Sequence, residues 1–183
     1  MKKYYKDYKL VSKTLPSGRV KQVAEYIGKY YICQLSETNL RRYKSYYFAL
    51  VLCSCTTAIG AGFINNPGSR IAYVALPHVS LFLPMVYNFI GTIGFMTSKS
   101  KLERGTYYKT KIRIRRSTIW QIILSSMAIL GDIIYMIYGL DGNSVQKELV
   151  FTVCMVLILV INLIYLQLQK RVVYQVEDPY YKE

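Results

Sequence analysis

The sequence predicts an all-α integral membrane protein, a four-transmembrane-helix bundle with a small cytoplasmic β-containing cap. Hydrophobic residues make up 52% of its 183 residues, yet the formal net charge is +14. High hydrophobicity and high positive charge occur in one chain because the apolar and the basic residues occupy different segments. Four apolar segments are long enough for helices that cross a bilayer, which takes about 20 residues. The only formally charged residue within these segments is Asp132.

The four expected spans are residues 46–64, 71–98, 117–140 and 149–168. Since a backbone in lipid must satisfy its own hydrogen bonds, each span should be a helix. An eight-stranded barrel would require an alternation of apolar and polar residues that the last span lacks. We therefore expect a basic region over 1–45, a membrane domain over 46–168 and a tail over 169–183.

The lysines and arginines predict how the spans are oriented. Eleven lie in 1–45, eight in 99–116 and three in 169–183, whereas the connections 65–70 and 141–148 hold one each. By the positive-inside rule, both termini should face the cytoplasm and the two short connections the outside. No cleavable signal peptide or lipidation motif is visible, so the first span is expected to direct insertion into the plasma (inner) membrane.

The positive charge needs no nucleic acid to explain it, and we expect none to be bound. The lysines and arginines of 99–116 are instead expected to meet anionic lipid headgroups at the surface of the bilayer. Aromatic residues near the span ends, such as Trp120 on the inside and Tyr73 and Tyr138 on the outside, fit the belts that mark membrane interfaces.

Residues 8–35 are predicted to form a three-stranded meander. They contain a Pro-Ser-Gly turn at 16–18 and a second candidate turn at 27–29, with valine, isoleucine and tyrosine around them. Ser36 is a suitable N-cap, so a helix should begin there and run into the first span.

Two further cytoplasmic segments, 106–116 and 171–176, alternate as strands do. A three-stranded piece of about 30 residues is only marginally stable alone. We therefore expect these segments and the meander to pack together as one cytoplasmic cap. Two alternatives stay open for 106–116, a disordered basic loop or the first turns of the third span.

Asp132 belongs to a polar stripe on the third span. Steps of three and four residues from it meet only polar, small or tyrosine side chains, whereas the residues off this line are mostly Ile, Leu and Met. The stripe consists of Thr118, Gln121, Ser125, Ala128, Asp132, Tyr135 and Gly139. Such spacing is typical of a helix–helix seam, which turns a costly charge toward protein. The fourth span repeats the spacing more weakly at Thr152, Met155, Leu159, Asn162, Leu166 and Gln169.

His78, the only histidine, is the predicted partner of Asp132. Each lies about eight residues from the outer end of its span, or about 12 Å deep at 1.5 Å per residue, so a hydrogen bond or ion pair is geometrically possible. Asn88 and Asn162 form a second candidate layer nearer the cytoplasm.

Two prolines interrupt the second span. Pro77 and Pro84 each free the carbonyl four residues earlier, at Tyr73 and Ser80. In lipid, these carbonyls must face protein or water.

The candidate residues for a polar seam or a translocation path are Asp132, His78, Asn88, Asn162, Gln121 and Ser125. We favour a non-enzymatic subunit or scaffold of a membrane complex, whose partner is another membrane protein or a second copy of the chain. A small oligomeric transporter or proton-linked channel that uses His78 and Asp132 is the alternative. Intramembrane catalysis is least favoured, because Ser125 lies about 10 Å along the helix from Asp132.

We expect no metal or cofactor. Cys53 and Cys55 lie two residues apart on a helix and point about 200° away from each other. Cys33 lies in the cytoplasmic region, where thiols stay reduced. Together with Cys154, these cysteines are expected to act as small buried hydrophobic residues.

Overall fold

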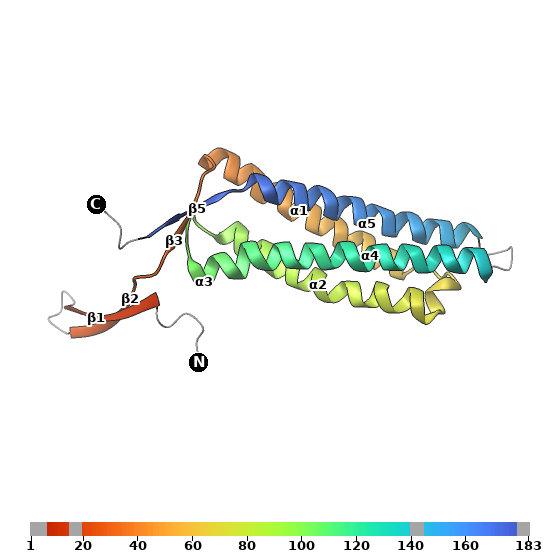
Figure 1. The fold of residues 1–183 in the computed structure, drawn as a ribbon, viewed down its shortest axis with the longest axis horizontal. Helices are drawn as coiled ribbons and strands as arrows, with labels where there is room; N and C mark the ends of the chain where they lie inside the picture. Colours follow the sequence, from red (N-terminus) through yellow and green to blue (C-terminus); the bar gives the residue numbers. More distant parts are fainter. Residues whose placement is uncertain (1–6, 15–19, 140–144, 179–183) are drawn as a thin grey trace.

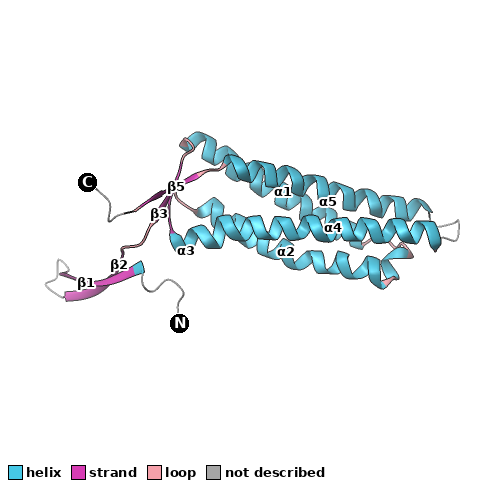
Figure 2. Ribbon diagram, viewed as in Figure 1, coloured by secondary structure: helices cyan, strands magenta, loops and turns pink. Residues whose placement is uncertain are grey.

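A computed structural model describes residues 7–14, 20–139 and 145–178, which form an elongated bundle of helices with strands at one end (Figure 1). Four helices run the length of the bundle: α1 (Glu37–Gly62), α2 (Ala72–Thr97), α4 (Arg113–Tyr138) and α5 (Val145–Arg171). The α1 helix packs against α2 and α5, and α4 packs against the same two helices. Below, the end that carries the strands is called the sheet end and the opposite end the far end (Figure 2).

The α1 helix begins where the sequence predicts. The Ser36 side chain accepts a hydrogen bond from the backbone N–H of Asn39 at 3.4 Å, as an N-cap does. Glu37 in the first turn adds a negative charge near the positive end of the helix dipole. One helix therefore runs from Glu37 through the apolar residues of the first candidate span to Gly62.

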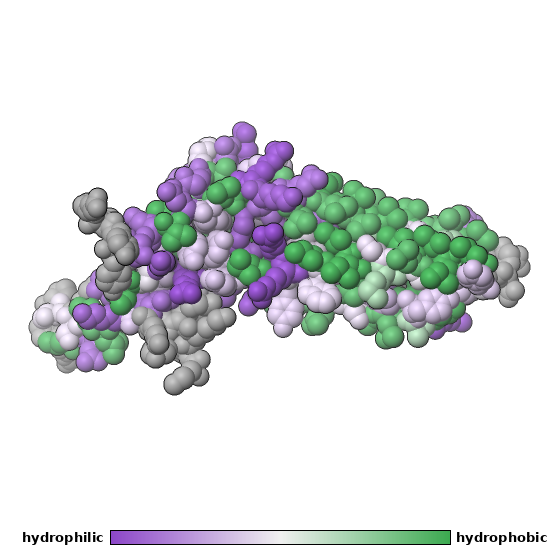
Figure 3. Space-filling view, in the orientation of Figure 1, coloured by the Kyte–Doolittle hydropathy of each residue, from purple (hydrophilic) through white to green (hydrophobic). Residues whose placement is uncertain are grey.

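All four long helical segments are long and apolar enough to cross a bilayer. Many of their large apolar side chains point away from the bundle, among them Leu76, Leu83 and Leu130, each more than 60% exposed. Figure 3 shows this apolar surface along most of the bundle, with hydrophilic residues gathered toward the sheet end. A monomer in water rarely exposes an apolar surface of this extent.

The strands form two small sheets. Strands β1 (Tyr8–Thr14) and β2 (Val20–Tyr26) make an antiparallel hairpin. Strand β3 (Tyr30–Cys33) is the centre of a second sheet, between β4 (Lys101–Glu103) and β5 (Tyr174–Glu177).

The predicted meander is therefore wrong in one respect, because its third strand pairs with the 98–103 connection and the tail instead of with β2. The predicted turn at 16–18 lies outside the described residues. The expected union of N-terminal, connecting and C-terminal segments is present, but the connecting strand is Lys101–Glu103.

The prediction of a strand over 106–116 is wrong. These residues form α3 (Arg104–Tyr107), the π-helical η3 (Tyr108–Ile112) and the start of α4, so the alternative of first turns of the third span holds. Thr110 and Ile114 lie four residues apart and are both buried, a spacing that fits one helix face as well as one strand face.

Lys111 stabilises the helical segment that leads into α4. Its ammonium group donates to the carbonyl of Gln169 at 2.6 Å and to the carbonyl of Val172. Both carbonyls lie at the C-terminal end of α5, where a positive charge also complements the helix dipole. The start of the third span is thus attached to the end of the fourth.

Tyrosines join the sheet to the helices. The Tyr31 ring stacks on the Tyr107 ring at a centroid distance of 4.0 Å, and Tyr174 meets Tyr107 edge-on at 5.4 Å. Burial raises the pKa of Tyr174, because the ionised phenol would lose its hydration there. These rings therefore contribute to the core of the cap.

Two tyrosine hydroxyls attach the hairpin to the sheet. Tyr8 donates to Glu103 at 2.6 Å, and the Tyr26 hydroxyl accepts from the backbone N–H of Arg104 at 3.0 Å. The hydrogen bond to Glu103, with smaller contributions from burial and neighbouring charges, raises the pKa of Tyr8 to about 12.

Replacement of Tyr8 by Phe should loosen the hairpin from the sheet, with a loss below about 1.5 kcal/mol because the bond is partly exposed to solvent. In the unsubstituted protein, this contribution is present below the ordinary tyrosine pKa of 10.0 and is lost as pH rises through about 12, since ionised Tyr8 cannot donate. Hydrogen exchange over β1 and β2 measures the attachment. Tyr46→Phe, on an exposed residue of α1, is the control; equal exchange in both variants would contradict the assignment.

Candidate functional site in the polar seam

The polar stripe of α4 is buried. From Thr118 to Asp132, its five members Thr118, Gln121, Ser125, Ala128 and Asp132 are at most 1% exposed. Tyr135 is also buried, whereas Gly139 at the end of the stripe is exposed. The stripe faces α2 and α5, the two neighbours of α4.

The matching face of α5 differs in part from the predicted one. Its buried residues are Glu148, Phe151, Met155, Ile158, Asn162, Tyr165 and Gln169, spaced alternately by three and four. Met155, Asn162 and Gln169 were correctly predicted, whereas Leu159 and Leu166 were wrong, since Ile158 and Tyr165 take those places. The true face begins at Glu148, one residue before the expected span and one turn earlier than Thr152, where the expected face begins.

Glu148 is the site residue that the sequence reasoning missed. It is fully buried, and its Oε1 accepts from the backbone N–H of Gly68 at 2.8 Å, while its Oε2 accepts from the Asn66 side chain at 2.5 Å. The sequence reasoning assigned it to the connection 141–148. Its spacing of three and seven residues from Phe151 and Met155 is the signal that could have placed it on the seam.

Asp132 and Glu148 form a buried carboxyl pair at the far end. Asp132 accepts a hydrogen bond from the Thr152 hydroxyl, and the Glu148 carboxyl lies beside the Asp132 carboxyl, next to Gly68. Ionised carboxylates only accept, so a bond between the two requires one proton. Within the described ranges, the ion pairs formed by lysine or arginine do not include either carboxylate.

The connection between α1 and α2 covers this pair. Gly68, in the short helix η2 (Gly68–Arg70), is buried, and a Cβ there would lie 2.7 Å from Glu148 Oε2 and 3.1 Å from Asp132 Oδ1. A side chain at residue 68 would therefore displace the two carboxyls. Two buried oxygens of the cluster, Asp132 Oδ1 and Asn66 Oδ1, have no geometrically satisfactory hydrogen-bond partner.

His78 does not pair with Asp132. Its Nε2 lies 3.3 Å from the carbonyl oxygen of Ala58 on α1, and its ring contacts the Phe82 and Phe151 rings. The two residues were matched by depth along their helices. Contact also depends on the rotation of each helix about its axis, which places His78 toward α1 and Asp132 toward α5.

Asn88 and Asn162 also bond separately. The Asn88 amide donates weakly to Thr118 at 3.5 Å, and Gln169 donates to the same hydroxyl at 3.0 Å. The Asn162 amide donates to Ser54 on α1 at 3.3 Å and to a carbonyl of its own helix. The predicted second layer thus consists of two clusters, one joining α2, α4 and α5 and one joining α1 and α5.

The remaining candidates bond to backbone carbonyls. Gln121 donates to the carbonyl of Pro84 at 3.3 Å across the α2–α4 contact, whereas Ser125 donates to Ile122 within its own helix. The carbonyl of Tyr73, freed by Pro77, faces α4 so closely that a Cβ at Gly131 would lie 2.8 Å from it. This carbonyl therefore faces protein, as expected.

The described residues contain no cluster of three or more His, Cys, Asp or Glu side chains able to hold a metal. The hypothetical relay residues Ser125, His78 and Asp132 bond to three different groups. Comparisons of the chain with protein-family models, curated proteins and solved structures give no match. What the seam can do must therefore be argued from its chemistry.

Replacement of Gly68 by Ala should destabilise the protein by about 1–3 kcal/mol, because the new methyl group would displace the carboxyl pair from its place under the connection. Thermal unfolding of the purified protein in detergent measures this loss. Gly60→Ala is the matched control, since a Cβ at Gly60 meets nothing within 4 Å and alanine is the better helix former. A melting temperature unchanged at Gly68→Ala would show that the site tolerates a side chain.

Proposed function

We propose that the protein is a four-span membrane protein that acts as a non-enzymatic subunit or scaffold of a membrane complex. The observation that carries this proposal is that polar side chains of the seam donate hydrogen bonds across the bundle, as Gln121 does to Pro84 and Asn162 to Ser54. Such bonds contribute about 0.6 kcal/mol each on average in a membrane and fix the register of the helices. Groups used in this way do not line a path for a solute.

The charge distribution supports an orientation with the sheet end in the cytoplasm of the cell. The strands and the basic segment that opens α3 and η3 lie at this end, and the hydrophilic surface gathers there (Figure 3). Positive residues are retained on the cytoplasmic side of membranes, and the plasma membrane is the proposed location.

The β1–β2 hairpin supports a role in binding another protein. Leu10 and Val20 lie on the same face of the hairpin and are 67% and 68% exposed. Apolar side chains on a strand pair with free edges are suited to a partner that adds a strand or covers the face. This hairpin is the part of the described chain that projects farthest from the bundle (Figure 1).

Affinity purification from native membranes in mild detergent tests the scaffold proposal. A protein should co-purify in a fixed ratio, and Leu10→Asp with Val20→Asp should lower its recovery several-fold, because a charge on the hairpin face opposes burial. Val176→Asp, on an exposed residue of β5, is the control. Purification of the chain alone, as a single small oligomer, would contradict a scaffold role.

One observation favours a proton-linked transporter as the second candidate. Asp132 and Glu148 lie side by side beneath Gly68, and two buried carboxyls this close favour a state in which they hold one proton between them. Two adjacent carboxyls that share a proton can take up and release it in turn. In this form of the transporter proposal, the partner of Asp132 is Glu148 instead of His78.

Two substitutions at Asp132 separate the candidates. Asp132→Asn supplies a permanent donor to Glu148, so the melting temperature should change little, whereas Asp132→Leu leaves Thr152 and Glu148 without this partner and should cost about 1–3 kcal/mol. Proton flux into vesicles that hold a pH-sensitive dye is measured in parallel. The scaffold proposal expects no flux in the unsubstituted protein; a flux that Asp132→Asn abolishes, with stability intact, would establish transport.

A further inference from the structure

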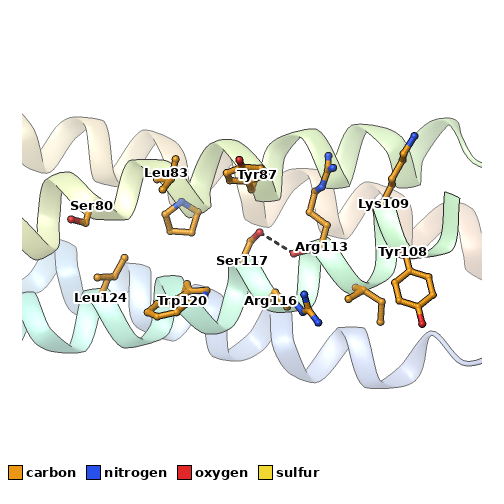
Figure 4. Close-up of a pocket in the computed structure, with 12 residues that line it drawn as sticks. Ser80, Leu83, Tyr87, Tyr108, Lys109, Arg113, Arg116, Ser117, Trp120 and Leu124 are labelled. Atoms are coloured by element: carbon orange, nitrogen blue, oxygen red, sulfur yellow. Dashed lines mark hydrogen bonds between the residues drawn. The ribbon is translucent and has the colours of Figure 1, made fainter. Parts of the chain in front are cut away.

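A groove runs between α2 and α4 on the outer surface of the bundle, with a cavity volume of about 730 Å³. This is within the range of about 300–1,000 Å³ typical of ligand sites. On α4 its lining follows one helix face, and on α2 the residues Ser80, Leu83, Pro84 and Tyr87 do the same. The small side chains of Ser80 and Ser117 leave the space between the helices open (Figure 4).

The two ends of the groove differ in character. Lys109, Arg113 and Arg116 line the part nearest the sheet end, and Figure 4 shows Lys109 and Arg113 pointing to one side of it and Arg116 to the other. Leu83 and Leu124 line the opposite part, and Trp120 lies between. The groove is thus cationic where the bundle meets its hydrophilic surface and apolar along the bundle.

The three cations lack acidic partners in the described part of the chain. The ion pairs found there join Lys29 to Asp178 and Lys101 to Glu177, both in the region of the sheet. Arg113 lies over the ring of Tyr87, with 5.9 Å from its guanidinium carbon to the centroid. Three cations that line the same end of an otherwise apolar groove favour an anionic ligand between them.

From these features we propose that the groove binds one anionic phospholipid, with the phosphate at Lys109, Arg113 and Arg116 and an acyl chain against Leu83 and Leu124. The inference rests on the proposed membrane location. Arg116 and Leu124 lie eight residues apart, or about 12 Å along the helix, which approaches the thickness of one leaflet of hydrocarbon, about 15 Å.

The same features argue against other occupants. A free inorganic anion makes no contact with the apolar walls, and a neutral lipid leaves the charge of the cations uncompensated. A zwitterionic phospholipid brings its own cation, which the three basic groups repel, so an anionic headgroup is preferred.

Trp120, the only tryptophan, reports directly on this groove. The full-length protein is reconstituted into vesicles of phosphatidylcholine and phosphatidylglycerol in equal parts, with brominated chains on one lipid or the other. We expect brominated phosphatidylglycerol to quench Trp120 more strongly. Arg113→Gln with Arg116→Gln should lower the preference roughly thirty-fold, as expected for two cations near a lipid surface at about 1 kcal/mol each.

Arg115→Gln is the matched control, since Arg115 is an exposed neighbour of the same charge that does not line the groove; it should keep the preference. The single change Lys109→Gln should give a partial loss, and circular dichroism confirms that each variant is folded. Equal quenching by both lipids in the unsubstituted protein, or a preference that survives the double change, would overturn the proposal.

Two further results distinguish other sources of failure. Abolition of the preference by added inorganic phosphate would mean that the site takes a free anion, which overturns the lipid assignment. Absence of quenching by either brominated lipid would overturn the membrane location itself, and with it the proposed function.

Discussion

In the membrane location proposed above, a group that can hydrogen-bond must find its partner inside the bundle, because hydrocarbon offers none. This constraint explains most of what the seam contains. The amide of Gln121 satisfies a proline carbonyl of α2, the amide of Asn162 reaches α1, and the carboxyl of Asp132 is held between Thr152 and Glu148. Each of these bonds also sets the rotation of one helix against its neighbour. In water, the burial of interlocking apolar side chains drives helices to associate. In this bundle, hydrogen bonds between polar residues fix how the helices pack.

Periodicity and composition predicted the parts of the fold that depend on a single helix. The four helices, the N-cap at Ser36 and the buried face of α4 follow from spacing, hydropathy and local bonding. Features that depend on two elements could not be predicted so well. Spacing does not give the rotation of α2, so the pairing of His78 with Asp132 was wrong, and local alternation does not say which strands meet, so the partner of β3 was wrong.

Glu148 shows why the candidate site was only half predicted. Glu148 is the fourth residue of α5 and follows a lysine. Two adjacent charged residues are typical of a connecting loop. The burial of Glu148 depends on Asn66 and Gly68, which lie about 80 residues earlier in the chain. No local pattern joins these segments. The strand prediction for 106–116 was wrong for a related reason. Thr110 and Ile114 satisfy both a strand and a helix pattern, and the contact of Lys111 with the end of α5 favours the helix.

The arrangement of the three-stranded sheet has a consequence for the order of events during synthesis. Its central strand β3 precedes every long helix, whereas its edge strand β5 follows the last of them. While the ribosome is still producing the helices, one side of β3 therefore has no partner. The sheet closes only when Tyr174–Glu177 emerges, after all four long helices are made. A chain that stalls or inserts a helix wrongly would leave an open strand edge, a feature by which quality-control proteases and chaperones could distinguish unfinished molecules from finished ones.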